Sequence, residues 1–344
     1  MEEPYVSKKR RKQVSSIDVA KKAGVSQATV SRVFSAGSNV SGELRQKVMR
    51  AAEELGYYPN YFSNGLSPES THIIGIVNPN FRSPFYFKAL KHFTLELQKL
   101  DYTAMLLNIP SGGKLEDVLP IAFRYQVDGL ITTSLQLTST LIKSCHEYNI
   151  PVVQFNRYSL GLEASSVSLD NIRAGREAAQ FLISRGHKRI AWIGGEAMSS
   201  TSKDRETGLS QELEQCGMDV FFRYEGDYSY ASGVEAARQF LENTEKPDGV
   251  FCASDEIAYG FIDCAEKEYG LNIPLDLSVI GFDDRIMSSS LRYNLTTFTQ
   301  PVKRMVKATI EVMIDTITNP RKEVQIKLIH GELIERGSVV NRKE

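Results

Sequence analysis

The spacing of apolar residues along this chain changes at residue 72, and the two parts predict different architectures. Up to residue 60, apolar residues recur every three or four positions, which is the spacing of amphipathic helices. From residue 72 onward, short apolar runs alternate with longer amphipathic stretches, as in sheets of buried strands covered by helices. The pattern therefore predicts a small all-helical domain followed by a larger α/β body.

Residues 16–35 predict two short helices joined by a tight turn. Ser16 is expected to cap the first helix, and Gly24 ends it where a left-handed residue is favourable. Its apolar stripe is formed by Ile17, Val19 and Ala20. The second helix is expected to begin after Ser26 and to pack its apolar side on the first. That packing turns the following side chains outward: Gln27, Ala28, Ser31 and Arg32.

Two such helices form a helix-turn-helix, a motif that reads DNA and that also occurs as a generic packing unit. Residues 40–60 add a third amphipathic helix, with Ser41 as its cap and Gly56 and Pro59 at its end. The segments DVAKKAGVSQATVSRV, VSGELRQKV and AAEELGYYPN resemble the N-terminal domain of the lactose-repressor (LacI) family of bacterial regulators. The downstream chain also resembles that family, so the resemblance covers nearly everything after residue 14.

Charge is distributed unevenly along the 344 residues, although the net charge is only −1. Residues 1–62 carry 11 Lys and Arg against 6 Asp and Glu, and the remainder carries 30 against 36. Because the N-terminal part is basic and the body is acidic, phosphate groups are attracted mainly to the N-terminal end. The segment SKKRRKQ at 7–13 holds five consecutive positive charges, which indicate either a disordered arm along DNA or a tail without a role.

Several classes of protein are not supported by the sequence. The four cysteines are scattered without a CxxC pair, so neither a zinc site nor a disulfide framework is indicated. No signal region or membrane span is visible, and a cytoplasmic location is expected. No GxSxG, GxGxxG, Walker or HExxH motif occurs, so an enzyme is not expected and no cofactor is predicted.

In the body, seven apolar runs predict strands buried on both faces, and the intervening stretches predict helices. The expected strands are 72–77, 102–109, 128–134, 151–156, 189–195, 248–254 and 278–283. The expected helices are 84–100, 116–126, 139–148, 172–185, 204–216, 230–243 and 256–269. The resemblance implies a type I periplasmic-binding-protein fold of two subdomains, with crossovers near residues 170, 300 and 330.

The expected domain organisation follows from these patterns and from the resemblance. A basic arm (1–14), a helix-turn-helix domain (15–59) and a hinge (60–71) precede an effector-binding and dimerisation domain (72–344). Its N-subdomain would comprise 72–170 and 300–330, and its C-subdomain 171–299 and 331–344.

Ligands of open α/β sheets bind beyond the carboxyl ends of the strands, so polar and aromatic residues that follow the predicted strands are candidates for effector contacts. Aromatic faces would stack on a sugar or base, while Arg and Asp would form charge-assisted hydrogen bonds. The resemblance implies that Arg205 and Asp283 are the most regular contacts, whereas the other residues vary with the ligand. The candidates are Phe85, Tyr86, Asn156, Arg157, Arg205, Tyr228, Asp255 and Asp283.

On DNA, Gln27 is suited to adenine, Arg32 to guanine and Ala28 only to a thymine methyl group. Small polar side chains are suited to contacts with phosphates, and such contacts position the protein on DNA. The candidates for these phosphate contacts are Ser15, Ser16, Ser26, Thr29, Ser31 and Asn39. In the family, the segment matching 60–67 is a hinge helix that orders on operator DNA. Leu66 matches the leucine that this helix inserts into the minor groove, and Asn60 would cap the helix. Gly65 weakens the helix. The alternative for this segment is a plain flexible linker.

The sequence therefore predicts a homodimeric transcription regulator, more specifically a repressor, that binds a pseudo-palindromic operator. A small molecule would control its DNA affinity, with Arg157 beside Asn156 favouring a sugar or sugar derivative. A nucleobase or nucleoside corepressor is the alternative ligand. A sugar-binding receptor without a regulatory role is the alternative from another class. No leucine heptads occur at the C-terminal end, which favours a dimer over a tetramer.

Overall fold

The computed structural model describes residues 14–34, 40–55, 57, 70–78, 84–109, 113–133, 137–159, 161–320 and 323–343. The chain forms two compact units, residues 1–71 and 72–344, here called the head and the body. The predicted basic arm up to residue 13, Asn39, and residues 60–69 of the predicted hinge, with Asn60 and Leu66, lie outside the described residues.

The head packs three helices around one small apolar core: α1 (Ser16–Ala23), α2 (Gln27–Phe34) and α3 (Gly42–Leu55). Its buried side chains recur at helical spacing, and they are Val19, Ala20, Ala23, Val30, Val33, Val48, Ala51 and Ala52. Gly24 ends α1 with φ of 62°, a left-handed conformation that glycine adopts without strain. The three predicted helices are thus confirmed.

Two local predictions in α1 are wrong. Its cap is Ser15, not Ser16, because Ser15 accepts the backbone N–H of Asp18 while the Asp18 carboxylate accepts the backbone N–H of Ser15. This reciprocal arrangement needs an acidic residue three positions after the cap, and Asp18 provides one. Ile17 is 49% exposed, because the buried stripe of α1 runs through Val19, Ala20 and Ala23 and leaves Ile17 at its edge.

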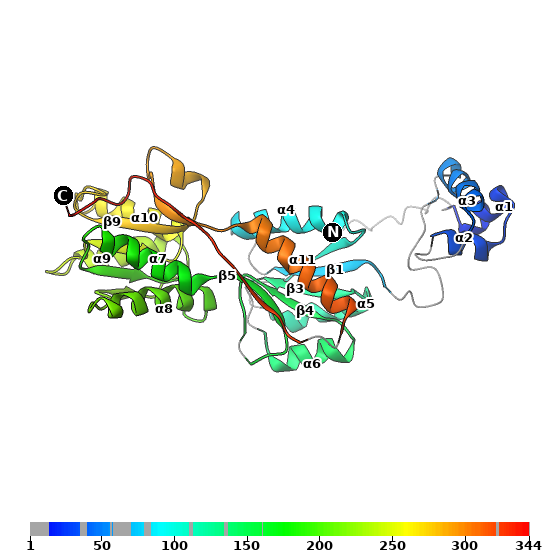
Figure 1. Cartoon of the computed structure of the whole chain (residues 1–344), viewed down its shortest axis with the longest axis horizontal. Coiled ribbons are helices and arrows are strands. Elements are labelled where there is room, and N and C mark those ends of the chain that lie inside the picture. The colour runs from blue at the N-terminus through cyan, green and yellow to red at the C-terminus, as the bar shows by residue number, and fades with distance from the viewer. Residues whose placement is uncertain are drawn as a thin grey trace, which may run out of the picture. The chain divides into compact units, whose positions relative to one another are not determined.

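The body contains two sheets, each with six strands among the described residues (Figure 1). Sheet A has the order β11-β5-β4-β3-β1-β2 and is parallel throughout. Its strands are β1 (Ile73–Asn78), β2 (Thr103–Asn108), β3 (Gly129–Thr133), β4 (Val152–Phe155), β5 (Ser165–Leu169) and β11 (Ile326–Ile329). Sheet B has the order β12-β10-β9-β8-β6-β7, with only β12 antiparallel. Its strands are β6 (Ile190–Ile193), β7 (Arg223–Tyr224), β8 (Gly249–Cys252), β9 (Ser278–Asp283), β10 (Thr296–Thr299) and β12 (Leu333–Ile334).

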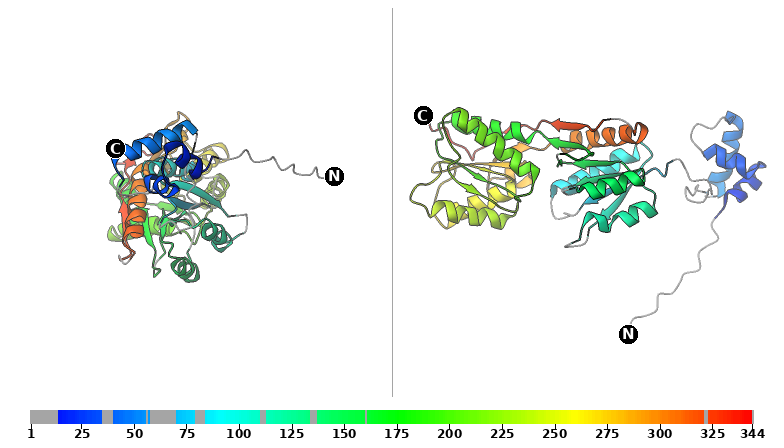
Figure 2. Two further views of the ribbon diagram at one scale, coloured as in Figure 1. Left: turned by 90° about the vertical axis from the view of Figure 1, so that its right-hand side faces the viewer. Right: turned by 90° about the horizontal axis from the view of Figure 1, so that it is seen from below.

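Helices cover both sheets, since side chains on both faces of the central strands are buried (Figures 1 and 2). Sheet A carries α4 (Pro84–Gln98), α5 (Leu119–Arg124), α6 (Ser139–Glu147) and α11 (Val302–Thr318), with a short 3-10 turn, η1 (Leu115–Asp117), before α5. Sheet B carries α7 (Asn171–Ser184), α8 (Ser200–Gln215), α9 (Tyr230–Leu241) and α10 (Asp255–Lys267), and the 3-10 turn η2 (Ile286–Ser289) follows β9. Helices α7 and α8 pack on each other, as do α9 and α10.

The chain crosses between the two sheets three times: after β5 at Asp170, after β10 at Gln300 and after β11 at His330. These crossings agree with the expected positions. Strands β5, β7, β10, β11 and β12 were not predicted, because they are short or rich in Ser and Thr and carry no apolar run. Helix α8 begins four residues earlier than expected, and the predicted helix 116–126 is divided into η1 and the shorter α5.

Candidate effector cavity and nucleic-acid interface

A cavity of about 670 Å³ lies between the two halves of the body, where the carboxyl ends of strands from both sheets meet. Its volume is within the range of small-molecule sites. Seven of the eight predicted effector residues line it: Phe85, Tyr86, Asn156, Arg157, Arg205, Tyr228 and Asp283. Segments distant in the sequence are therefore brought to one place by the parallel topology.

Asp255 differs from the expectation, because its side chain is fully buried below the cavity rather than part of its wall. Its carboxylate accepts hydrogen bonds from Arg285 N, Ser288 Oγ and Thr297 Oγ1 at 2.6–2.8 Å. Burial, followed by the charge of Asp283, raises the pKa of Asp255 to about 6. Asp255 thus supports the cavity floor from below.

The sequence reasoning missed other polar residues that line the cavity: Glu196, Thr201, Asp227, Glu256, Arg285 and Gln300. Three of them follow predicted strands or segments already singled out, because Glu196 comes after β6, Glu256 follows Asp255 and Arg285 follows Asp283. Gln300 follows β10, a strand that no apolar run indicated. Strand-end position was the signal that would have found Glu196, Glu256 and Arg285, whereas Gln300 carried no such signal.

Arg205 is 2% exposed, and the described residues that it hydrogen-bonds are neutral. Its Nε donates to Asn171 Oδ1 at 2.9 Å, and its Nη1 donates to the carbonyl oxygen of Ala253. The guanidinium also lies 3.4 Å from the centroid of the Phe282 ring, a cation–π contact. Burial lowers its pKa. Because a guanidinium carries five N–H donors, several remain for a ligand.

Arg157 and Tyr158 connect the two halves across the cavity. Arg157 Nη2 donates to Glu196 Oε2 at 3.0 Å, and the Tyr158 hydroxyl donates to Asp204 Oδ1 at 2.8 Å. Arg157 and Tyr158 follow β4 of sheet A, whereas Glu196 and Asp204 belong to the half built on sheet B. Both contacts therefore join the two halves at the cavity.

Three residues of the cavity wall have a left-handed backbone: Asn156 (φ 67°), Tyr228 (φ 65°) and Asp283 (φ 124°). Such conformations are unfavourable for residues with a side chain and concentrate at ligand sites. The Tyr228 ring lies against Gly195, where a Cβ atom would approach the ring to 2.1 Å. Its hydroxyl hydrogen-bonds with Ser199 Oγ and Thr201 Oγ1 at 2.8 and 3.0 Å, which fixes the ring in the wall.

Three buried polar atoms of the wall have no hydrogen-bond partner among the described residues: Asn156 Oδ1, Arg157 Nε and Gln300 Oε1. Buried polar atoms are otherwise nearly always paired. Phe85 and Tyr86 add aromatic surface, with ring centroids 5.0 Å apart in an edge-to-face arrangement. The cavity thus combines aromatic surface with polar groups that a bound molecule would satisfy.

In the head, α2 presents polar side chains beside an apolar core. Ser26 caps α2 as predicted, since its Oγ accepts the backbone N–H of Thr29 at 3.1 Å. Gln27, Ala28 and Arg32 are exposed, as expected of residues that face DNA. The Gln27 amide donates to Ser16 Oγ at 3.1 Å, which links the starts of the two helices.

The described residues hold no group of three His, Cys, Asp or Glu side chains that would bind a metal ion. No helix in the described part of the chain is long and apolar enough to cross a membrane. The four cysteines are free.

Comparisons with known proteins agree with this architecture. Residues 17–60 match the model "Bacterial regulatory proteins, lacI family", and residues 164–339 match "Periplasmic binding protein-like domain". Catabolite control protein A of Priestia megaterium is 35% identical over 84% of this chain and 88% of its own length. The HTH-type transcriptional repressor PurR of Serratia proteamaculans is 32% identical over 94% of this chain and 96% of its own.

A solved structure described as a transcriptional regulator CelR-cellobiose complex is 30% identical, with a TM-score of 0.72, and covers 95% of this chain and 100% of that one. The matched relatives are transcriptional regulators rather than enzymes. The helix-turn-helix head, the two-sheet body and the similarity over most of the chain together show that this protein belongs to the lacI family of bacterial regulatory proteins, as a DNA-binding transcription regulator.

Proposed function

We propose that this protein is a repressor that binds a pseudo-palindromic operator as a homodimer in the bacterial cytoplasm. A sugar or sugar derivative in the cavity would control its DNA affinity. The observation that carries the choice of ligand is the set of buried, unpaired polar atoms in the cavity wall, among which two amide oxygens, Asn156 Oδ1 and Gln300 Oε1, are acceptors.

A sugar fits this wall because it brings many hydroxyl donors together with apolar ring faces. The carboxylates of Glu196, Asp227, Glu256 and Asp283 add further acceptors to those two amide oxygens. Phe85 and Tyr86 offer aromatic surface on which a sugar ring stacks. A nucleobase carries fewer N–H donors and would leave more of these acceptors unpaired. The cellobiose complex of the CelR relative agrees with this choice.

Homodimer formation is supported by exposed apolar side chains on both halves of the body. In the half built on sheet B, Ile286 is 92% exposed and Leu291 is fully exposed. In the other half, Phe87 is 67% exposed, and Leu95 and Leu106 are also exposed. Exposed large apolar side chains of this kind are candidates for contacts with a second copy of the chain. A dimer also doubles the DNA site, since a single helix-turn-helix contacts too few bases for selectivity.

The ligand assignment is tested by a thermal-shift screen with cellobiose, monosaccharides and purine nucleobases. A ligand at 100 times its Kd adds about 2.7 kcal/mol of stability, which is readily detected. We expect stabilisation by a sugar and none by a nucleobase. Operator affinity is then measured with and without the hit, because an inducer weakens DNA binding and a corepressor strengthens it. Stabilisation by a nucleobase alone would establish the alternative ligand.

For the head, we expect Gln27→Ala and Arg32→Ala each to weaken operator binding by roughly 1–3 kcal/mol and to relax the preference at particular base pairs. The reason is that both side chains are exposed on α2 and suited to base edges. Lys99→Ala, at an exposed residue of the body, serves as the control. Affinity is measured on operator variants and on random DNA. Equal losses on both DNAs would mean that these residues contact only phosphates.

The remaining proposed DNA contacts are Ser15, Ser16, Ser26, Thr29 and Ser31, which would bind phosphates. Two of these residues, Ser15 and Ser26, also cap α1 and α2. Capping orients the amino-terminal ends of both helices, where backbone N–H groups favour an anion. These serines would therefore act on DNA partly by positioning the helix ends.

A further inference from the structure

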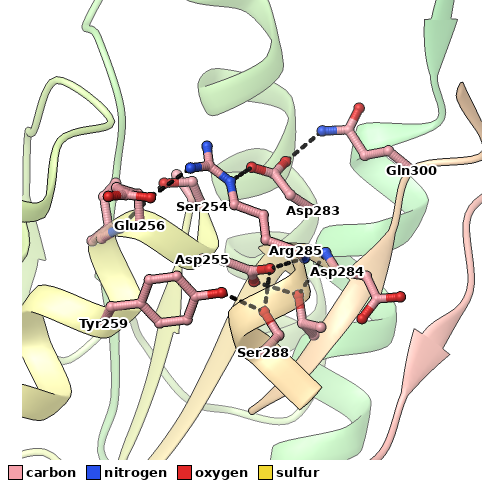
Figure 3. Close-up of polar contacts among 12 residues, drawn as sticks. Ser254, Asp255, Glu256, Tyr259, Asp283, Asp284, Arg285, Ser288 and Gln300 are labelled. Atoms are coloured by element: carbon pink, nitrogen blue, oxygen red, sulfur yellow. Dashed lines mark hydrogen bonds and ion pairs between the residues drawn. The ribbon is translucent and has the colours of Figure 1, made fainter. Parts of the chain in front are cut away.

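Three carboxylates come together at the ends of β8 and β9. Asp255 and Glu256 begin α10, and Asp283 is the last residue of β9 (Figure 3). Such a group of like charges is unfavourable in a partly buried site unless a cation or several donors compensate it. The compensation comes from a residue that the sequence analysis did not select, Arg285.

Arg285 contacts all three carboxylates at once. Its Nε lies 3.2 Å from Asp283 Oδ2, and its Nη1 lies 2.5 Å from Glu256 Oε2. Its backbone N–H donates to Asp255 Oδ2 at 2.8 Å. In the described part of the chain, no other cation forms an ion pair with Asp283 or Glu256. The Arg285 side chain is 19% exposed and lines the cavity beside Asp283 and Glu256.

The Asp283 carboxylate is held from both sides. Gln300 Nε2 donates to its Oδ1 at 2.5 Å, while Arg285 holds its Oδ2. A carboxylate offers about four lone-pair positions, so about two remain for a ligand. With both oxygens fixed, those positions keep a constant direction toward the cavity.

The other charged and titratable groups around this cluster have separate partners. Asp284 pairs with Arg336 at 2.6 Å, and the Tyr259 hydroxyl hydrogen-bonds with Ser288 at 2.7 Å. Arg205, from α8, interacts with Asp283 through its charge but hydrogen-bonds neutral acceptors. Thr297 and Ser288 donate to Asp255 without contributing charge. The neutralisation of the cluster therefore depends mainly on Arg285.

We propose that Arg285 is a positioning residue of the effector site, which neutralises Asp283 and Glu256 and fixes the direction in which Asp283 accepts hydrogen bonds from the ligand. The proposal rests on the proposed function and deepens it. It also defines the chemical class of the ligand at this end of the cavity. An anionic group there would compete with Asp283 and Glu256 for one guanidinium, whereas uncharged hydroxyl groups would use the free lone pairs. The part of the ligand that contacts Asp283 is therefore an uncharged polyol.

The role of Arg285 has a consequence that does not require a ligand. Because burial raises the pKa of Asp255 to about 6, Asp255 is protonated in the folded state at about pH 5 and ionised at about pH 8. Folded-state protonation of a group with a raised pKa favours the fold at low pH, and that contribution is lost as the pH rises through about 6. Without Arg285, the three ionised carboxylates would repel one another most strongly at high pH.

The test compares Arg285→Gln with the parent by thermal unfolding of the full chain. We expect Tm to fall by about 4 °C at about pH 8 and by less than half as much at about pH 5. Arg285→Lys keeps the positive charge, so its Tm at about pH 8 should fall by less than that of Arg285→Gln. The matched control is Arg238→Gln, because Arg238 pairs with Glu268 on the surface at 2.8 Å. Hydrogen bonding to Arg238 lowers the pKa of Glu268, so the control should show no difference between the two pH values.

A Tm deficit of equal size at both pH values would overturn the proposal and leave Arg285 as a packing residue. A second measurement uses the sugar found in the screen, with cellobiose tested first. We expect Arg285→Gln to bind it at least tenfold more weakly and Arg238→Gln to bind it as the parent does. Unchanged affinity of Arg285→Gln would also overturn the proposal. If the parent binds no sugar, the proposed ligand class fails, while the pH dependence of Tm still decides whether Arg285 neutralises the carboxylates.

Discussion

Replacing Gly208 by alanine is expected to destabilise the half of the body built on sheet B by more than about 3 kcal/mol. A Cβ atom on Gly208 would lie 1.9 Å from the carbonyl oxygen of Ile172 and 2.8 Å from its carbonyl carbon. Both atoms belong to the backbone of α7, so no side chain is able to move aside. Helices α7 and α8 would have to separate, and the buried contacts along their whole length would weaken.

Gly175 on α7 makes the reciprocal approach, since its Cβ would lie 2.1 Å from the carbonyl oxygen of Arg205. The same close packing therefore positions Arg205 at the cavity, and we expect Gly208→Ala to weaken ligand binding as well. Trp192 is the only tryptophan of the chain and lies buried in β6. Its fluorescence during urea unfolding measures the stability of this half directly.

The control is Gly42→Ala in the head, where a Cβ atom would meet nothing within 4 Å. This variant should leave the Trp192 transition unchanged and slightly favour α3, because alanine is the better helix former. Gly260→Ala offers a second test, since its Cβ would lie 2.0 Å from the carbonyl oxygen of Tyr230 in the α9–α10 pair. A Gly208→Ala variant that unfolds at the same urea concentration as the parent would contradict this account of the helix packing.

Asp283→Asn is expected to weaken effector binding by roughly 1.5–3 kcal/mol, the range of a charge-assisted hydrogen bond. The amide keeps the shape of the carboxylate but removes its charge and one acceptor, so only one of the two donors that hold the side chain, Gln300 Nε2 or Arg285 Nε, keeps its acceptor. Arg205→Lys should have an effect of similar size, because lysine does not reproduce the planar array of donors that contacts Asn171 and Ala253.

Ligand affinity is measured by calorimetry, and operator affinity is measured with and without the ligand. Operator binding without an inducer should survive both substitutions, because the head is unchanged. Glu206→Gln is a suitable control, since Glu206 pairs with Arg223 outside the cavity at 2.8 Å. If the Asp283 and Arg205 variants bind the ligand as the parent does, the two residues have only a structural role.

Most of the architecture followed from local patterns. The head helices have caps and a helical spacing of apolar residues, and Gly24 ends α1. Each of these features acts over a few neighbouring residues. The central strands of both sheets are buried on both faces and are therefore apolar throughout. The edge strand β11 and the serine-rich strand β5 beside it lack that signal. Their positions depend on pairing with distant strands.

The candidate site was predictable in part for the same reason. Parallel topology gathers strand ends, so positions such as Asn156, Arg205 and Asp283 were expected near one cavity from their order along the chain alone. The order of the strands along the chain does not determine which of two neighbouring side chains points into the cavity. Asp255 and Glu256 are adjacent at the start of α10, yet Glu256 lines the cavity and Asp255 is buried beneath it.

The sequence by itself determined the family, the two-part architecture and the residues that follow the strands, because hydrophobic periodicity and capping are local and strand order fixes where strand ends lie. Only the tertiary structure decided the partners of those residues. Arg285 neutralises carboxylates on two different elements, Gln300 reaches Asp283 from the crossover, and Gly208 meets the backbone of α7. These contacts join segments far apart in the chain, and side-chain direction and distance exist only once the segments have packed.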